Sequence, residues 1–492
     1  MIRRICFTLV SSVLSLYLAG CSTAPQHETP QLPPDWFHAS ERASLEPTAL
    51  ARWWDRFDDP QLTAAVTRAM EANYDAQLAM LRIEAARAQF RQARAGLFPV
   101  LDLPGSASRQ WIDVDPPAAA REQLQQFDLD LDEGVSIDMW ELALQASWQV
   151  DLFGANRART QGARQQVRAA QAESIAARLS VAGGAAQGYI RIRSMQAQLA
   201  LLEEGEQVAG QFAHISRMLF EAGEVTRLDV EASAAERESI VAQRHQAQAA
   251  LAQAQLALDT LLAVPPGTTA ARMRGGAGAI IPIADEAIAP GQPIDLLRRR
   301  PDLIAAAAGL QGADLQSLAA RRDLFPQLSV QAAAGRSGLA VGDAVSSASN
   351  FARIGATFAL PLLDYSRRQA AIAQADVTGE QAYLAFQQAI AEALEDVEGA
   401  LVDVEGQRRR QRALQRTLAH RERAQALAHR SYELGEANLA EVLDAQRGAL
   451  ETRRQVVEAR AALATAQVAL YLALGGGWQG PEPGTAAASA SR

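Results

Sequence analysis

The chain has 492 residues and a formal net charge of −9, and all 47 of its basic residues are arginine. Without the first 20 residues it keeps 45 basic and 56 acidic residues, a net charge of −11. This acidic balance argues against nucleic acid as a partner. We attribute the absence of lysine to genomic composition bias rather than to a need for arginine's rigid donor fork.

Residues 1–20 have the pattern of a secretory signal peptide. Two arginines form the charged start, and residues 5–18 form an apolar core. The motif L-A-G-C, which ends at Cys21, resembles a bacterial lipoprotein processing site. Cleavage before Cys21 would leave a thiol that carries acyl chains, enough for stable membrane anchoring. The alternative is an ordinary signal peptide followed by a chance cysteine.

The residue after this cysteine bears on the membrane. In the lipoproteins that this segment resembles, an aspartate there favours the inner membrane, so Ser22 indicates the outer membrane. The only other cysteine, Cys6, leaves with the signal, and the mature chain therefore has no disulfide. We expect no cofactor apart from the covalent lipid on Cys21, and no metal.

No run of 18 or more apolar residues follows the signal, so we expect no transmembrane helix. Any membrane crossing then requires β-strands in a closed barrel, because unpaired backbone groups are costly in lipid. Residues 21–52 are rich in Pro, Thr and Ser and are expected to form an N-terminal tether.

The rest of the chain carries one sequence plan twice. The motif L-F-P recurs at residues 97–99 and 324–326, and a helix-breaking glycine recurs as Gly223 and Gly435. We therefore divide the chain into segments with the following bounds: first structural repeat 53–263, equatorial connector 264–295 with room for short strands, second structural repeat 296–474, and C-terminal tail 475–492.

Each repeat contains a pair of expected strands, within residues 98–152 and 327–363. In the clearest strand, 138–152, leucine, alanine, tryptophan and valine alternate with glutamine, serine and alanine. This period of two predicts a sheet that is wet on one face. Strands of about 10–14 residues suit a tilted membrane crossing. A soluble β-sandwich would need more than four strands.

A long helical hairpin follows each strand pair, at residues 154–262 and 364–474, and a shorter helical tract is expected over 53–97. About 70 residues without a helix breaker precede each glycine turn, which corresponds to about 100 Å of helix. Helices of this length indicate coiled-coil or helical-barrel packing.

Four strands cannot close a transmembrane barrel, since the smallest known kind has about eight. The barrel must therefore be shared between chains. Two chains would give a barrel nearly filled by its own side chains, whereas larger barrels hold water. The polar face of the strands favours a water-filled lumen, and hence three or more subunits around a pore.

Several motifs carry a resemblance to a known family. They are W-W at 53–54 with D-P at 59–60, D-L-F-G at 151–154, R-R-P-D at 299–302, and the two glycine turns. Together they span nearly the whole mature chain, which resembles the TolC/OprM class of outer-membrane factors and, in particular, its NodT-like lipoprotein branch. One departure is the all-alanine stretch 305–308, where the family often carries an Ala-Glu pair.

The resemblance implies an α+β membrane protein that forms a homotrimer. Four strands per chain would make a 12-stranded β-barrel in outer-membrane lipid, continuous with a long periplasmic α-helical barrel. The trimer would be the exit duct of a tripartite efflux pump. Its partners would be a periplasmic adaptor and an inner-membrane transporter, of the resistance-nodulation-division type.

The two turns would lie at the periplasmic tips of the helical tube. By resemblance, the residues that meet the adaptor are Gly223, Glu224, Val225, Gly435, Glu436 and Ala437. The alternative is that the two glycines are only left-handed helix caps.

A gate is expected beside the turns. Glu441 and Asp444 are three residues apart, on one helical face, and in a trimer would form two rings of carboxylates. They match the family's acidic constriction, and Asp229 matches the acid after the first turn. A solvated charged face is the alternative. The family often has a basic residue where this chain has Ala437, so Arg227 or Arg447 is expected to substitute.

The segment 110–137 is expected to be an extracellular loop. It contains six acids, for which divalent-ion or lipopolysaccharide contact is the functional interpretation and simple solvation the preferred one: Asp113, Asp115, Asp128, Asp130, Asp132 and Glu133.

We find no enzyme motif: the six histidines have no H-E-x-x-H spacing, and the sequence contains no P-loop, dinucleotide loop or G-x-S-x-G elbow. The expected function is passive, gated export of drugs or other small amphiphiles. Type I protein secretion and metal-ion efflux use the same architecture and stay open, although no Met or His cluster follows the expected lumen. A trimeric stalk or adhesin would instead show sustained heptads.

Overall fold

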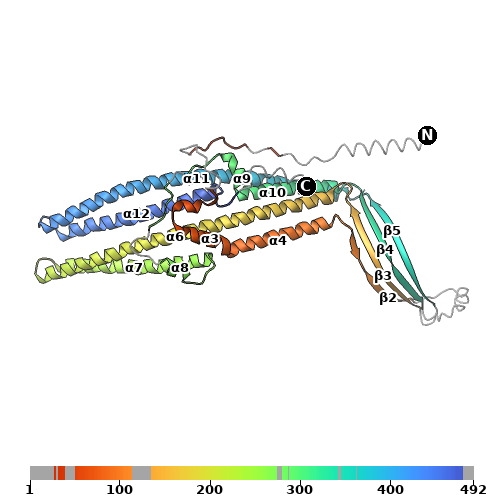
Figure 1. Cartoon of the computed structure of the whole chain (residues 1–492), viewed down its shortest axis with the longest axis horizontal. Helices are drawn as coiled ribbons and strands as arrows, with labels where there is room; N and C mark the ends of the chain where they lie inside the picture. Colours follow the sequence, from red (N-terminus) through yellow and green to blue (C-terminus); the bar gives the residue numbers. More distant parts are fainter. Residues whose placement is uncertain are drawn as a thin grey trace. The chain divides into compact units, whose positions relative to one another are not determined.

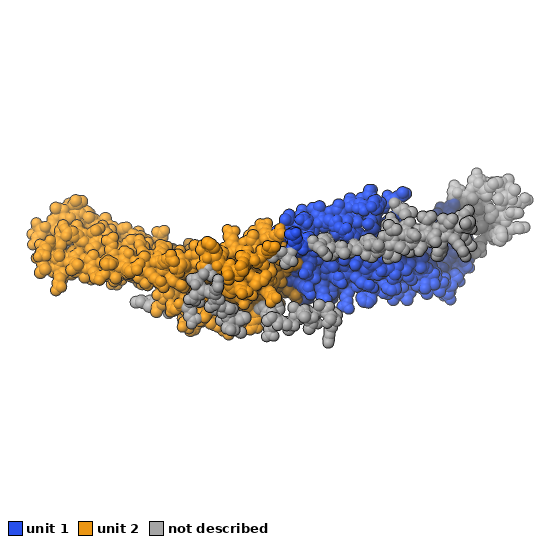
Figure 2. All heavy atoms as spheres, turned by 90° about the horizontal axis from the view of Figure 1, so that it is seen from above, with its two compact units in different colours: residues 1–28, 85–168, 308–384 blue, residues 29–84, 169–307, 385–492 orange. Residues whose placement is uncertain are grey.

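A computed structural model describes most of the chain and divides it into two compact units. The described residues are 27–28, 31–38, 50–112, 135–273, 280–285, 288–341, 345–361 and 363–479. Unit 1 comprises residues 1–28, 85–168 and 308–384, and unit 2 comprises residues 29–84, 169–307 and 385–492 (Figure 2). Cys21 and the six acids of segment 110–137 lie outside the described residues.

Unit 1 contains one antiparallel sheet (Figure 1). Its strands are β1 (Val100–Asp102), β2 (Gly105–Ile112), β3 (Val135–Val150), β4 (Gln327–Val341) and β5 (Val345–Ala359). Both β1 and β2 pair with β3, so they are one strand interrupted at Pro104, which has no N–H to donate. The sheet is thus a four-strand meander. Its three long strands have 16, 15 and 15 residues, more than the 10–14 expected.

The two strands that join the repeats lie at the centre of this sheet. Strand β3 of the first repeat pairs with β4 of the second over 14 residues, and β4 pairs with β5. The outer edges of β2 and β5 have no strand partner within the described residues. A single chain therefore leaves two open edges.

The register sorts the side chains of the sheet into an apolar and a polar face. Trp148, Val330 and Ala356 lie in one row across three strands, and Ser147, Gln331 and Gly355 lie in the next. Large apolar side chains on the first face are exposed in the single chain, with Ile354 82% and Phe358 64% exposed. An apolar face this open requires a cover that the chain does not supply itself.

The strand-to-helix junctions of the two repeats meet each other in unit 1. The carboxylate of Asp151 accepts hydrogen bonds from the backbone N–H groups of Asn156 and Arg157, at 3.1 and 2.9 Å, and so caps the following helix. Phe153 stacks on Phe325 with ring centroids 4.8 Å apart. The D-L-F-G motif of one repeat thus packs against the L-F-P motif of the other.

The helices are long and mostly straight runs (Figure 1). They are the 3-10 turns η1 (Trp53–Phe57) and η2 (Pro293–Asp295) and the helices α3 (Pro60–Ala72), α4 (Tyr74–Ala95), α6 (Ala155–Glu221), α7 (Arg227–Leu261), α8 (Thr268–Arg272), α9 (Leu296–Arg299), α10 (Pro301–Arg322), α11 (Tyr365–Glu433) and α12 (Leu439–Ala473). At 67 and 69 residues, α6 and α11 are each about 100 Å long.

Two helical expectations need correction. The tract 53–97 is not one helix, because Asn73 adopts an extended conformation between α3 and α4. The Asn73 amide donates to the Leu261 carbonyl at 3.0 Å, and its side-chain oxygen caps α4 through the N–H of Asp75 at 2.8 Å. In the described part of the connector the regular elements are the short helix α8 and the turn η2, in place of the strands for which there was room.

The core of unit 2 is aromatic at its centre. Trp53 is fully buried and stacks on Tyr471, with centroids 5.6 Å apart, while Trp54 and Phe57 meet it edge-on. The W-W motif at the start of the first repeat therefore packs on the last helix of the second. This contact explains why the motif carries the fold rather than a ligand.

The D-P motif acts next to this core. One oxygen of Asp59 caps α3 through the N–H groups of Gln61 and Leu62, at 2.8 and 3.1 Å. The other accepts from the Tyr189 hydroxyl at 2.7 Å, which fixes α3 to α6. Burial, followed by the bond to Asp59, raises the pKa of Tyr189. Tyr189 therefore stays a neutral donor throughout the physiological range.

Part of the N-terminal tether is held on unit 2. Trp36 is buried and its indole N–H donates to the Gly291 carbonyl at 3.0 Å. The backbone N–H groups of Phe37 and His38 both donate to the carboxylate of Glu398, at 2.6 and 3.0 Å. Residues 36–38 are thus docked by an aromatic anchor and a carboxylate clamp.

By length and composition one described helix could cross a membrane, residues 440–473 of α12, with a mean hydropathy of 1.3. The sequence pattern did not single it out, because arginines and acids interrupt its apolar residues. Leu463, Val468 and Tyr471 of this helix belong to the buried core of unit 2. Its apolar character therefore serves packing between helices.

Candidate functional site

The two glycine turns have the same backbone geometry, and both lie at the same end of unit 2 (Figure 1). Gly223 and Gly435 have φ of 79° and 75°, in the left-handed region. The next N–H reaches back five residues in each, from Glu224 to Leu219 and from Glu436 to the carbonyl of residue 431, both at 2.8 Å. These are Schellman caps, in which glycine is favoured because it has no Cβ to clash.

The tips of the turns are open to solvent. Glycine and glutamate at 223–224 and 435–436 are exposed, and Val225 and Ala437 are half-buried. Nothing lies within 4 Å of a Cβ built on either glycine, so space does not limit these positions. In the described residues no hydrogen bond or ion pair joins one turn to the other. The two tips are therefore separate exposed surfaces on one unit.

Two of the three expected gate acids also cap a helix. Asp229 and the hydroxyl of Thr226 form a capping box at the start of α7, with the Thr226 N–H donating to Asp229 at 2.9 Å. Glu441 holds the same position in α12, where its N–H donates to the Asn438 side chain at 3.0 Å. The hydrogen bonds from Thr226 hold the pKa of Asp229 below its usual range.

Asp444 differs from the other two acids. It is exposed, one turn further along α12, and no hydrogen bond or ion pair to it occurs within the described residues. Glu441 is exposed as well, so both side chains leave the same stretch of α12 toward solvent. The structure thus brings the pair together beside the second turn and leaves Asp444 without a structural role.

Ion pairs link the two hairpins behind the turns, at positions that sequence reasoning largely missed. Arg447 of α12 makes a two-pronged contact with Glu236 of α7, at 3.1 and 2.8 Å. Arg227, the other expected substitute, reaches only Glu231 of its own helix, at 3.6 Å. Of the two, Arg447 is the one that joins the hairpins.

A second arginine ties three helices together. Arg453 of α12 pairs with Glu204 of α6 at 2.8 Å and with Glu422 of α11 at 3.1 Å. Nothing in the sequence marks this set, because its members are far apart along the chain. All four long helices of unit 2 are therefore connected by charge just behind the turns.

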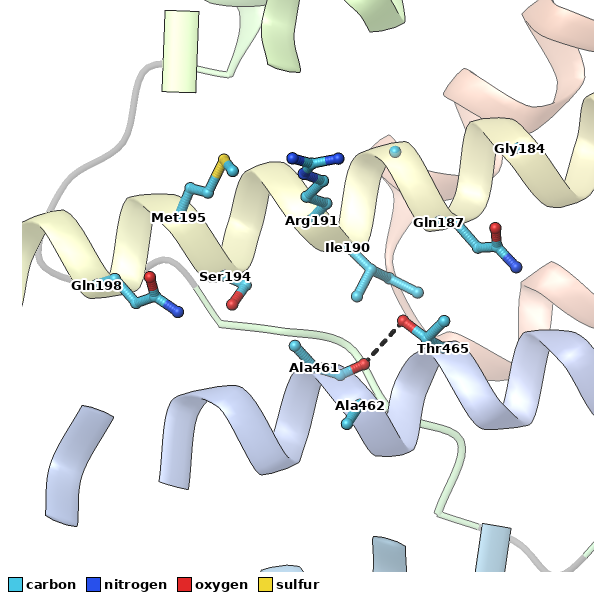
Figure 3. Close-up of a pocket in the computed structure, with 11 residues that line it drawn as sticks. Gly184, Gln187, Ile190, Arg191, Ser194, Met195, Gln198, Ala461, Ala462 and Thr465 are labelled. Carbon is cyan, nitrogen blue, oxygen red and sulfur yellow. Dashed lines mark hydrogen bonds between the residues drawn. The ribbon is translucent and has the colours of Figure 1, made fainter. Parts of the chain in front are cut away.

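An open groove lies between α6 and α12 (Figure 3). It has a volume of about 560 Å³ and is lined largely by small residues such as Gly184, Gly188 and Ala461. Ser194 lies on the side of α6 toward α12, whereas Arg191 points away from it. Arg191 is the one ionisable residue in its lining, so the groove offers no acid–base pair. Among the described residues no cluster of metal-ligating side chains occurs.

An open-edged sheet with one apolar face and paired helices about 100 Å long define a class of protein, the membrane-embedded duct built from several copies. A family model described as outer membrane efflux protein matches residues 65–264 and 293–476, well over half of the chain. The chain belongs to this family. The match covers most of both sequence repeats.

Curated relatives match over almost their whole length. The chain is 29% identical to outer membrane protein OprJ of Pseudomonas aeruginosa over 489 residues, 97% of each chain. It is 27% identical to the cation efflux system protein CusC of Escherichia coli O157:H7, over 96% of this chain and 99% of CusC. It is also 27% identical to the pyoverdine export outer membrane protein OpmQ of Pseudomonas aeruginosa, over 97% and 98%.

Solved structures give the same result. The outer-membrane channel OprN superposes with a TM-score of 0.79 at 25% identity, over 93% of this chain and 100% of OprN. A CusC structure superposes with a TM-score of 0.76 at 25% identity, over 93% and 100%. The Campylobacter jejuni channel CmeC, at 21% identity and a TM-score of 0.80, supports the fold.

These likenesses confirm the TolC/OprM/NodT class and the expected fold, in which three chains share the barrel strands and the helical tube. The protein is an outer-membrane efflux channel, the exit duct of an efflux pump. Channels of this class are trimers that work with an adaptor and an inner-membrane transporter. The relatives are ducts and not enzymes.

The capping box predicts a pH-dependent contribution to stability. Because the pKa of Asp229 is lowered in the folded state, its contribution is present above the unfolded value of about 3.9 and is lost as the pH falls through the folded value. Replacing Thr226 by valine removes the donors of the hydroxyl and should lower the thermal unfolding midpoint at pH 7. The difference from wild type should shrink below about pH 4.

The control is Thr260→Val, also in α7. The Thr260 hydroxyl donates to the carbonyl of Leu256 and not to a carboxylate, so any effect should be independent of pH. A wild-type difference for Thr226→Val that persists unchanged down to pH 3 would contradict the assignment of the box. The midpoint is measured by circular dichroism at 222 nm.

Proposed function

We propose that the protein is a gated, passive exit duct for drugs or other small amphiphiles, with its gate at the start of α12. The observation that carries this proposal is the exposed pair Glu441 and Asp444 beside the second turn. In a trimer the pair becomes two rings of three carboxylates. Such rings repel anions and favour cations, so cationic amphiphiles are the substrates that fit best.

The double role of Glu441 supports a gate that moves with its helix. Its backbone N–H and its carboxylate both bond Asn438, at 3.0 and 2.9 Å, so the side chain is tied to the first turn of α12. A displacement of the helix end then displaces the ring. Asp444 adds charge to the ring, since no bond in the described residues holds it elsewhere.

We further propose that the six turn residues contact a periplasmic adaptor and that the inner-membrane transporter is of the resistance-nodulation-division type. Exposure of both turns supports the first part. Because each trimer would present six such tips, an adaptor made of helical hairpins could pack tip to tip around the tube. Energy for transport would come from the transporter, since the duct itself is passive.

A second candidate substrate class is metal cations. Its support is the whole-length similarity to CusC, which is named a cation efflux protein. An acidic constriction would pass metal cations as readily as organic ones. The charge of the gate favours cations in general, and competition between the two classes for conductance separates them.

The gate is tested by single-channel conductance in a planar bilayer. Purified wild-type trimer should show a low, cation-preferring conductance at rest. The double variant Glu441→Ala/Asp444→Ala removes both carboxylate rings, so its conductance should rise several-fold and its preference for cations should fall. The measurement is the current–voltage relation in asymmetric salt.

The matched control is Glu392→Ala/Glu395→Ala, two exposed carboxylates three residues apart on α11, about 60 Å from the second turn. Its conductance should equal that of the wild type. Equal conductance in wild type and gate variant would remove the gate from this account while leaving the duct.

Anchoring is proposed through acylation of Cys21. The support is the L-A-G-C motif and the Ser22 that follows it. Cells labelled with radioactive palmitate should incorporate label into the wild-type protein and none into Cys21→Ala, with both proteins in the outer-membrane fraction because the strands still insert. Label that persists in Cys21→Ala would exclude this site of acylation.

A further inference from the structure

An arginine stripe runs along one side of α11. Arg409, Arg416, Arg423 and Arg430 recur every seven residues, and all four are exposed. Residues 408–430 contain eight arginines and one acid, a net charge of +7 in a chain of −9. A strict seven-residue spacing keeps side chains on one side of a helix that is wound in a left-handed supercoil. The buried residues of α11 at this level, Val404 and Gln411, lie on the opposite side.

An acidic stripe runs along one side of α7. Glu231 and Glu238 are also seven residues apart, and each side chain is 67% exposed. The buried residues of α7 at this level are Ser233 and Ile240. At 100° per residue, these two lie on the other side of the helix from the glutamates. Both stripes therefore face away from the packing of their own chain.

The other helices of unit 2 are already engaged within the chain. Arg453 links α12 to α6, and Arg244 links α7 to Glu206 of α6 at 2.8 Å. Figure 1 shows α12 and α6 between α11 and α7 at this end of unit 2. The free flank of one hairpin is thus basic, and the free flank of the other is acidic.

The arginine stripe has no acid from another helix in its own chain. Within the described residues, Arg409 pairs with Glu405 at 2.7 Å and Arg423 contacts His420 at 3.3 Å, both on α11 itself. No acid of α12 or α6 reaches the four stripe residues. Such a row of like charges would repel itself unless an acidic surface covers it.

The two stripes lie at matching heights. Arg447 follows Gly435 by 12 residues and pairs with Glu236, which follows Gly223 by 13, so the two turns are level. Arg430, Arg423 and Arg416 precede Gly435 by 5, 12 and 19 residues. Glu231 and Glu238 follow Gly223 by 8 and 15, which places each glutamate between two arginines, within about 5 Å along the axis.

Cyclic symmetry supplies the occupant. In a ring of identical subunits, the flank that one copy offers must meet the opposite flank of the next copy. We propose that the arginine stripe of α11 docks on the acidic stripe of α7 in a neighbouring copy, so that each trimer contains three such contacts behind the periplasmic tips. The proposal rests on the trimer common to the family and not on the gate acids.

The contact would set the register between subunits at the end of the tube that must open. Exposed ion pairs are individually weak and are screened by salt, so the interface can loosen without loss of the trimer held by the barrel. An acidic partner protein on the same stripe is the competing occupant. Chemical cross-linking separates the two, because only the first joins copies of this chain.

The test uses paired cysteines in a Cys21→Ser background, where the mature chain has no other thiol. Full-length Glu238→Cys/Arg423→Cys, oxidised in membranes, should give covalent dimers and trimers on non-reducing gels. The control Glu236→Cys/Arg423→Cys carries its first thiol on the side of α7 that faces Arg447 of its own chain, and should stay monomeric. Monomers alone in the first variant, or ladders of equal yield in both, would overturn the proposal.

A charge exchange gives a second test. Glu231→Arg/Glu238→Arg should lower the yield of a cross-link between the two flanks several-fold, and adding Arg416→Glu/Arg423→Glu should restore it. The cross-link here is formed by cysteines replacing Ala235 and Arg430. Loss without restoration would mean that the charges act otherwise. Neither readout depends on conductance, so a failed gate leaves this test intact.

Discussion

The structure depends on one constraint, the need to pair every backbone N–H and C=O group that lies in lipid. The sheet of one chain has four strands, an exposed apolar face and two open edges. In a bilayer each unpaired backbone group costs several kcal/mol, so this sheet cannot exist there alone. Closure by three copies satisfies the edges, and the same closure makes the pore.

Trimer formation then constrains the helices. The two repeats place equivalent hairpins in unit 2, so a trimer has six hairpins around one axis. Within a chain the hairpins are joined by Arg447 and Arg453, and each chain therefore behaves as one connected set of four helices behind the turns. Movement between such sets, rather than within them, is the simplest way to widen the tube.

The local features could be predicted from the sequence. Alternation in the strands, the long runs without helix breakers and the glycine turns depend on neighbouring residues, and the structure has the corresponding elements. The motif at 59–60 and the one at 151–154 also act locally, through carboxylates that cap the next helix. The expected lengths of the strands were too short, because the ends of β3, β4 and β5 contain small and polar residues.

The features that depend on distant contacts could not be predicted. Asn73 breaks the first helical tract because its amide binds the end of α7. Ala263 adopts the left-handed conformation, with φ of 49°, at the place where the second repeat has Gly475, so the residue type alone hid this cap. The role of Asp229 and Glu441 in capping was also missed, although T-x-x-D before a helix is a signal for it.

The central claim is that three copies close the periplasmic end of the tube through the start of α12, and that loss of the acidic rings opens it. The most direct measurement is the distance between spin labels on Glu436→Cys, in a Cys21→Ser background, by pulsed electron paramagnetic resonance. The account predicts one narrow distance between equivalent labels in the resting trimer, and a longer one when Glu441→Ala/Asp444→Ala is added. An unchanged distance in that variant would contradict the account.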